Sequence, residues 1–177
     1  SGEHNGSVPG YLSSALYEQH NDGTYNIINT SIPNDYAISY SNAIGDTDND
    51  GYPEIAVNNI NHDNIFLWKN NTAHANNWLK IKLEGTQSNK NGIGSFIEIS
   101  INGEKQYRYT LCGEGYLSQN SATEIFGLGD ASQVDYVKVK WLSGVEDIIL
   151  NVSSNQLLNV IEGSTLSIED SVVIHLA

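Results

Sequence analysis

Apolar and polar residues alternate with a period of two along most of the second half of the chain. Leu79, Ile81 and Leu83 fall on one face of a predicted strand, while Lys80 and Lys82 fall on the other. Short runs of this kind, separated by Gly and Asn turns, are typical of a β-sandwich or barrel. No segment has a sustained 3.6-residue period, so the pattern predicts an all-β chain. The further predicted strands are 96–101, 106–112, 124–128, 137–141, 146–152, 156–161 and 165–168.

The first half of the chain has shorter and less regular apolar runs. Asn21-Asp22-Gly23 lies between the runs 11–18 and 24–28, and Asn or Asp followed by Gly at such a place predicts a β-hairpin. A polar stretch without periodicity, 70–77, is where we place a domain boundary. The chain is thereby divided into residues 1–73 and 74–177. The remaining predicted strands before the boundary are 36–44, 54–58 and 65–69.

Between two of these strands lies a loop with a regular spacing of carboxylates. Asp46, Asp48 and Asp50 alternate, Gly51 follows directly, and Glu54 comes three residues after the glycine. A loop that curls around a hard cation turns every second side chain inward, and glycine permits the sharp turn. A solvated acidic turn is the competing interpretation, because Asp, Asn and Gly are common turn residues. That interpretation gives no reason for the spacing.

The spacing predicts a Ca²⁺ site, since Ca²⁺ takes six to eight oxygen ligands. An EF-hand requires a bidentate Glu at the twelfth position, which is Val57 here, and a helix after the loop. The residues after the loop read as a strand instead, so we predict a Ca²⁺ hairpin. Its predicted ligands are the carboxylates of Asp46, Asp48, Asp50 and Glu54 and the backbone carbonyl of Tyr52.

Charge and composition restrict the partners. The net charge of −13 and the pI near 4.5 argue against nucleic acid and against anionic membrane surfaces, which both attract clustered Lys and Arg. No apolar run is long enough for membrane insertion, and no signal peptide is recognisable. The single cysteine, Cys112, is predicted to be a small core residue, and Trp78 and Trp141 are also predicted to lie in the core. The abrupt apolar end favours a piece cut from a longer polypeptide.

No catalytic constellation can be assembled from the sequence. There is no Gly-x-Ser-x-Gly elbow, no His-Glu-x-x-His motif and no Cys/His cluster. We therefore predict that the chain is not an enzyme. We predict no catalytic residues and no residues that bind an organic cofactor. The predicted site residues are the Ca²⁺ ligands alone.

Two sets of motifs resemble known families. The first set, in residues 1–73, resembles the FG-GAP/VCBS-type β-propeller repeat and consists of Leu16-Tyr17, Asn21-Asp22-Gly23-Thr24-Tyr25 and the run from Asp46 to Val57. The second set resembles the ASPIC/UnbV domain of the cartilage acidic protein family and its bacterial secreted relatives. It consists of Asn77-Trp78-Leu79, 88–94 (SNKNGIG), 113–119 (GEGYLSQ), 126–130 (FGLGD) and 139–144 (VKWLSG).

The resemblance implies a Ca²⁺ loop between the first two strands of a propeller blade. Glu54 stands where that family usually has Asp, and Leu142 stands where the ASPIC/UnbV family often has Pro. Residues 11–69 hold only about one and a half blades, which cannot close a propeller. The incomplete blade is therefore expected to pack its apolar face against the second domain, to bury that face against another chain, for example by self-association, or to leave it uncovered.

These observations together predict a non-catalytic, secreted or cell-surface Ca²⁺-binding module for recognition or adhesion. Its expected partner is an extracellular protein or a glycan, and Ca²⁺ would be structural. The alternative is a C-terminal accessory domain, with a carbohydrate-binding role, of a larger secreted enzyme. The expected fold is all-β: antiparallel blade-like strands with a Ca²⁺ hairpin, followed by a β-sandwich or barrel domain.

Overall fold

The structure, a computed structural model, describes residues 15–20, 22–28, 39–59, 64–72 and 75–165. Within these ranges the chain forms strands and no helix, which confirms the all-β class. The described part contains no helix that could cross a membrane. The strands are β1 (Tyr17–Gln19), β2 (Tyr25–Ile27), β3 (Ser39–Gly45), β4 (Glu54–Asn59), β5 (Phe66–Trp68), β6 (Asn77–Glu84), β7 (Phe96–Ile101), β8 (Glu104–Tyr109), β9 (Thr123–Gly129), β10 (Gln133–Lys140), β11 (Glu146–Ser153) and β12 (Gln156–Ile161).

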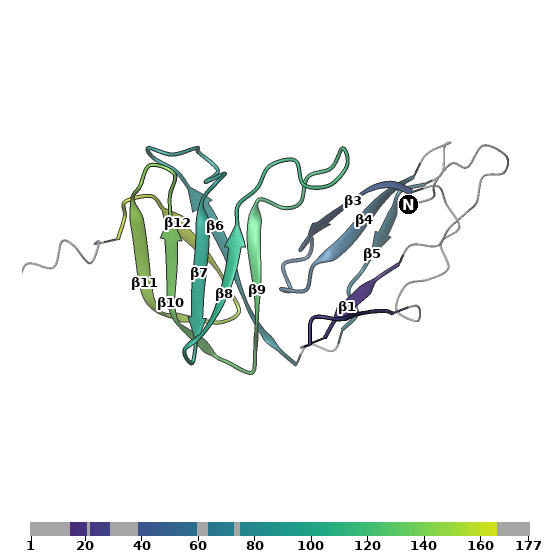
Figure 1. The fold of residues 1–177 in the computed structure, drawn as a ribbon, viewed down its shortest axis with the longest axis horizontal. Helices are drawn as coiled ribbons and strands as arrows, with labels where there is room; N and C mark the ends of the chain where they lie inside the picture. The colour runs from purple at the N-terminus through teal and green to yellow at the C-terminus, as the bar shows by residue number, and fades with distance from the viewer. Residues whose placement is uncertain (1–14, 21, 29–38, 60–63, 73–74, 166–177) are drawn as a thin grey trace, which may run out of the picture.

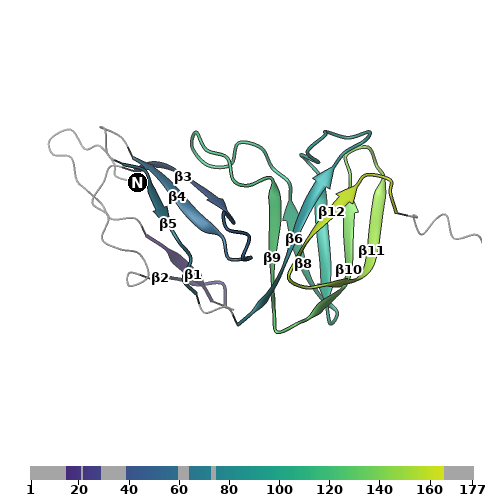
Figure 2. The same cartoon turned by 180° about the vertical axis from the view of Figure 1, so that it is seen from behind.

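Strands β6 to β12 form two sheets that enclose the main core. One sheet has the order β11-β10-β7-β8 and the other the order β12-β6-β9 (Figures 1 and 2). The predicted alternation is confirmed where it matters most, because the inward residues of β6, β7 and β10 are buried. Phe126 of β9 is the largest fully buried side chain. The core residues are Leu79, Ile81, Leu83, Ile97, Ile99, Phe126, Leu128, Val134, Val137, Val139, Trp141, Val152 and Val160.

Of the two predicted alternatives, the described strands form the sandwich, because they do not close into a barrel. Strand β12 pairs with β6 in parallel register, which the sequence pattern does not predict, whereas the other described pairs are antiparallel. The predicted core position of Cys112 is wrong. Cys112 is exposed, because it follows the end of β8 and lies in the long loop to β9. Trp141 is buried as predicted, but Trp78 is only half-buried.

A buried carboxylate just after β12 joins three segments at one end of the sandwich. Glu162 is 4% exposed, and its Oε2 accepts hydrogen bonds of 2.7 Å from the backbone amides of residues 86–88. Its Oε1 accepts from the hydroxyls of Ser88 and Ser143. Burial raises the pKa of the Glu162 carboxyl, but these hydrogen bonds outweigh burial and lower the pKa to about 2. The ionised carboxylate therefore holds two loops and the segment that follows β12 together.

A second buried carboxylate, Asp147 of β11, joins the residue that follows β10 to the segment that follows β12. Asp147 is fully buried and accepts a hydrogen bond of 2.7 Å from the indole Nε1 of Trp141. It also accepts from the backbone amides of Gly163 and Thr165 at 2.8 and 2.9 Å. Burial raises the pKa of Asp147, and the hydrogen bonds, first that from the Thr165 hydroxyl, lower it to a net value below the ordinary one. The Trp141 side chain is thereby satisfied inside the core.

Strands β1 to β5 form a separate hairpin and a three-stranded sheet. The predicted hairpin is confirmed: β1 and β2 pair antiparallel, and Gly23 has a φ of 83° in the turn. Strands β3, β4 and β5 pair in that order. The first residues of the predicted strands 11–18 and 36–44, and the last three of 165–168, lie outside the described residues.

The long loop between β8 and β9 covers the free edge of β3 (Figure 1). The backbone amide of Ile44 donates to Asn120 Oδ1, and the amide of Ser121 donates to the carbonyl of Ile44, both at 2.9 Å. The Tyr40 and Tyr116 rings lie 5.5 Å apart. The sandwich thus occupies one edge of the small sheet, which blunts an edge that could otherwise pair with another chain.

Candidate metal centre

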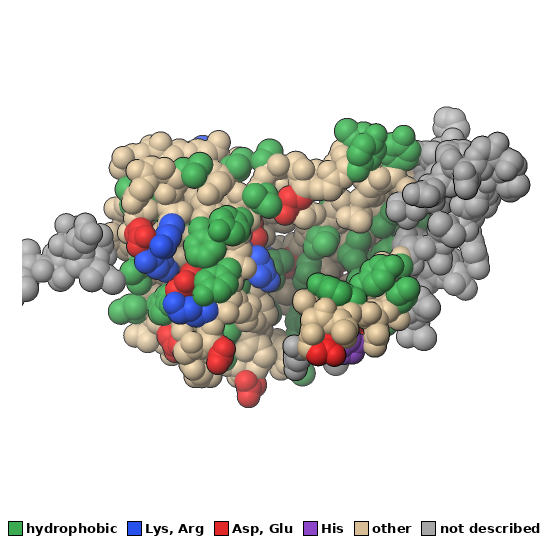
Figure 3. All heavy atoms as spheres, in the orientation of Figure 1, with side chains coloured by type: hydrophobic (Ala, Val, Ile, Leu, Met, Phe, Trp, Pro, Cys, Tyr) green, Lys and Arg blue, Asp and Glu red, His purple; other side chains and the backbone are tan. Residues whose placement is uncertain are grey.

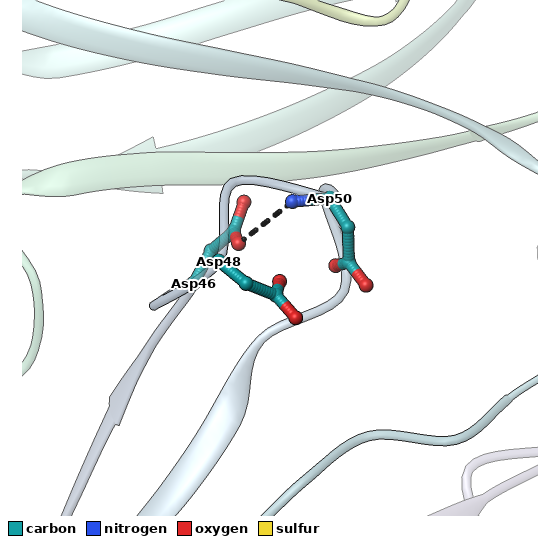
Figure 4. A group of neighbouring side chains, drawn as sticks. All are labelled: Asp46, Asp48 and Asp50. Carbon is teal, nitrogen blue, oxygen red and sulfur yellow. Dashed lines mark hydrogen bonds between the residues drawn. The ribbon is translucent and has the colours of Figure 1, made fainter.

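The acidic loop joins the end of β3 to the start of β4. One carboxylate oxygen each from Asp46, Asp48 and Asp50 lies within 4.8 Å of the others, so the structure brings together three of the predicted ligands. The backbone amide of Asp50 donates to Asp46 Oδ1 at 3.1 Å (Figure 4). The amide of Tyr52 donates to Asp50 Oδ1 at 2.8 Å. Asn49 and Gly51 have positive φ values of 63° and 88°, which give the loop its tight curl.

Glu54, the fourth predicted carboxylate, is fixed against the same loop. It is 3% exposed, and its Oε2 accepts hydrogen bonds from the backbone amide and the hydroxyl of Thr47, both at 2.8 Å. Its Oε1 is buried and has no hydrogen-bond partner. Thr47 lies between Asp46 and Asp48, so Glu54 is held against the loop that carries the other acids. Its carboxylate is not part of the group of three whose oxygens lie within 4.8 Å of one another. A buried carboxylate oxygen without a donor is costly, and a bound cation would remove that cost.

Tyr52 was predicted to supply a backbone carbonyl. Its hydroxyl reaches toward the sandwich and donates to the carbonyl of Asn76 at 2.8 Å. This bond positions the loop residue whose carbonyl is the predicted ligand. Whether that carbonyl binds a metal stays a prediction.

The loop is docked on the first residues of β6. A Cβ added to Gly51 would lie 2.2 Å from ring atoms of Trp78, so the indole packs directly on the glycine backbone. Glycine is therefore required here both for its positive φ and for this close approach. The contact also explains why Trp78 is only half-buried: its indole covers the loop instead of entering the core.

Lys80 is the residue of this site that sequence reasoning missed. It was assigned to the polar face of β6 together with Lys82, which is exposed. Lys80 is instead 5% exposed, and its Nζ lies 2.8 Å from Asp46 Oδ2 and 2.9 Å from Asn49 Oδ1. Its position two residues after Trp78 was the available signal, because residues i and i+2 of a strand share a face.

A second lysine contacts the loop from its exposed side. Lys69 Nζ lies 2.7 Å from Asp48 Oδ2, with the side chains 60% and 38% exposed. The hydrogen bond from Lys69 lowers the pKa of Asp48, and the same bond raises the pKa of Lys69. Asp48 is therefore ionised and ready to act as a ligand at neutral pH.

The three aspartates form an acidic cluster that could hold a metal ion. Carboxylate oxygens are hard donors, which suit hard cations better than soft ones. In the described part of the chain, this is the group of acidic, His and Cys side chains close enough to hold a metal.

Comparison with known proteins finds a match for part of the chain. Residues 85–167 match the family model for ASPIC and UnbV. The ASPIC/UnbV match includes β7 to β12 and the Glu162 and Asp147 networks. It begins after β6, so Trp78, Lys80 and the acidic loop lie before it. No curated protein matches the chain. The resemblance of the first 73 residues to an FG-GAP/VCBS repeat stays a prediction.

Proposed function

We propose that the chain is a non-catalytic extracellular recognition or adhesion module that binds Ca²⁺ as a structural ion. The observation that carries the proposal is the convergence of Asp46, Asp48 and Asp50. It is supported by the buried, unpartnered Oε1 of Glu54, a side chain that Thr47 holds against the same loop. Asp46, Asp48, Asp50 and Glu54 would hold the ion through carboxylate oxygens, and Tyr52 through its carbonyl. Lys80 and Lys69 already offset the charges of Asp46 and Asp48, and the ion would offset the remaining negative charge and so stabilise the folded state.

The proposal also divides the chain into two domains. Residues 1–73 would form a partial FG-GAP/VCBS blade region and residues 74–177 an ASPIC/UnbV-like sandwich. Secretion or display at the cell surface, where Ca²⁺ is abundant, fits such a site. An extracellular protein or glycan would be the ligand, and the described part of β5 is paired on one side only, which leaves an edge for self-association.

Thermal melting in CaCl₂ and in EDTA tests the metal proposal. A ligand that binds only the folded state adds about 2.7 kcal/mol at a hundredfold excess over its Kd. For a chain of this size that corresponds to a Tm rise of roughly 5–10 °C. MgCl₂ at equal ionic strength is the control and should give a smaller rise, because Mg²⁺ demands a tighter octahedral geometry. Coincident melting curves in CaCl₂ and EDTA would contradict the proposal.

One surface favours the alternative of an accessory carbohydrate-binding domain. On the outer face of the four-stranded sheet, the Phe96 ring lies 5.4 Å from that of Tyr107 and 4.8 Å from that of Tyr109. Both tyrosines are about half exposed, and Lys138 and Lys140 stand on the adjacent strand. Figure 3 shows hydrophobic side chains gathered on this face beside basic ones. Aromatic rings of this kind can stack on the apolar faces of sugars.

A glycan array at millimolar Ca²⁺ distinguishes the two roles. The carbohydrate role predicts hits that are lost in Tyr109→Ala, a substitution outside the core. An array without hits argues for a protein partner.

A further inference from the structure

The two lysines that contact the acidic loop differ in burial. The Lys80 and Asp46 side chains are only 6% and 2% exposed, whereas the Lys69–Asp48 pair is open to solvent. Lysine is almost never buried unless it is paired, so the position of Lys80 is specified by the loop. Its partners come from the loop of one sheet, and Lys80 itself comes from β6 of the other.

Lys80 occupies the oxygen of Asp46 that the loop's own backbone also uses. Asp46 Oδ2 accepts from the amide of Gly51 at 2.9 Å as well as from Lys80. Asp46 Oδ1 accepts one long bond of 3.1 Å from the amide of Asp50 and retains capacity for a further ligand. The ammonium and a metal ion would therefore share one carboxylate, one on each oxygen.

Two cations on one buried carboxylate repel each other, and burial reduces the screening between them. The ammonium also does part of what a metal would do. It neutralises one acid of the loop and connects Asn49 to β6, and its Nζ lies over the Trp78 ring, 5.6 Å from the ring centroid. The effects on the two states have opposite signs: Lys80 stabilises the metal-free loop and disfavours the metal-bound one.

We propose that Lys80 is a built-in cation that keeps the acidic loop docked on the sandwich when Ca²⁺ is absent and weakens the Ca²⁺ affinity of the loop. This inference rests on the proposed Ca²⁺ site. It requires more Ca²⁺ to fill the site than the loop would need without Lys80, and it places the response to Ca²⁺ where the loop contacts β6.

The test compares the wild-type chain with Lys80→Met and Lys69→Met by calorimetric titration with CaCl₂ and by melting in EDTA. Methionine keeps the length and apolar character of the lysine stem and removes the charge. Lys80→Met should bind Ca²⁺ at least about tenfold more tightly and should melt at a lower temperature in EDTA. Lys69→Met, the exposed control, should change the Ca²⁺ affinity by less than about threefold.

The two readouts separate this role from a purely structural one, in which Lys80→Met would lower both the melting temperature and the Ca²⁺ affinity. Unchanged or weaker Ca²⁺ binding by Lys80→Met, with wild-type binding intact, overturns the inference and leaves the proposed function standing. Ca²⁺ binding by Lys80→Met alone supports the inference and overturns the metal site of the natural chain. No binding by any of the three overturns both.

Discussion

Asp46→Asn is expected to destabilise the Ca²⁺-free protein by about 3 kcal/mol, with a fall in Tm of roughly 6–12 °C. The substitution preserves the shape of the side chain but removes the charge opposite Lys80. The Lys80 ammonium is buried, and its Nζ lies 2.8 Å from Asp46 Oδ2. Breaking one side of a buried pair leaves an uncompensated charge, which costs far more than losing an exposed pair. Urea unfolding in EDTA measures the change.

Asp48→Asn is the matched control for this prediction. Asp48 belongs to the same acidic group, but its lysine partner is exposed. Both substitutions should weaken Ca²⁺ binding at least about tenfold, because each removes a charged ligand. Only Asp46→Asn should lower the stability in EDTA. Equal stabilities of the two variants in EDTA would contradict the buried Lys80–Asp46 contact.

Glu162→Gln is expected to give the second large effect, a clear fall in Tm at pH 7. The carboxylate accepts bonds from the amides of residues 86–88 and from the Ser88 and Ser143 hydroxyls, whereas a glutamine amide would turn donor hydrogens toward some of these donors. Glu84→Gln is the control, since Glu84 pairs with Lys90 at the exposed surface and should change Tm little.

The pH dependence of this effect follows from the pKa of Glu162. Its pKa in the folded chain is about 2, below the ordinary value of 4.5, so the folded state favours the ionised form. The resulting stability is fully present above the ordinary pKa and is lost as pH falls from about 4.5 toward 2. The difference in Tm between wild type and Glu162→Gln should therefore shrink across this window. A difference that stays constant down to pH 2 would show that the Glu162 charge does not matter.

Local pattern predicted where most of the described strands lie, but not all of their bounds: β8 ends three residues before the predicted end, and β10 begins four residues before the predicted start. Alternation placed Leu79, Ile81 and Leu83 in the core, and Asn102-Gly103 marked the turn between β7 and β8. These features depend on side-chain period and on turn residues, which are properties of neighbours in sequence. The parallel pairing of β12 with β6 depends on how distant strands meet, and no local pattern encodes it.

The candidate site also has a part that local sequence predicts and a part that depends on distant strands. The spacing of Asp46, Asp48 and Asp50 predicted their convergence, because a single loop imposes it. Lys80 comes from a strand that lies far along the chain, and its alternating pattern looks the same whether the outer face meets water or another sheet. Ser88 and Ser143 carried the ASPIC/UnbV resemblance, but only the fold shows that both donate to Glu162.

A crystal structure of the chain grown in CaCl₂, with anomalous scattering measured at long wavelength, tests the central claim most directly. We expect one Ca²⁺ in the loop, with Asp46, Asp48, Asp50, Glu54 and the Tyr52 carbonyl as ligands and Glu54 Oε1 as one of the coordinating atoms. A loop with no anomalous peak at millimolar Ca²⁺, and with Lys80 as its only cation on Asp46, would contradict it.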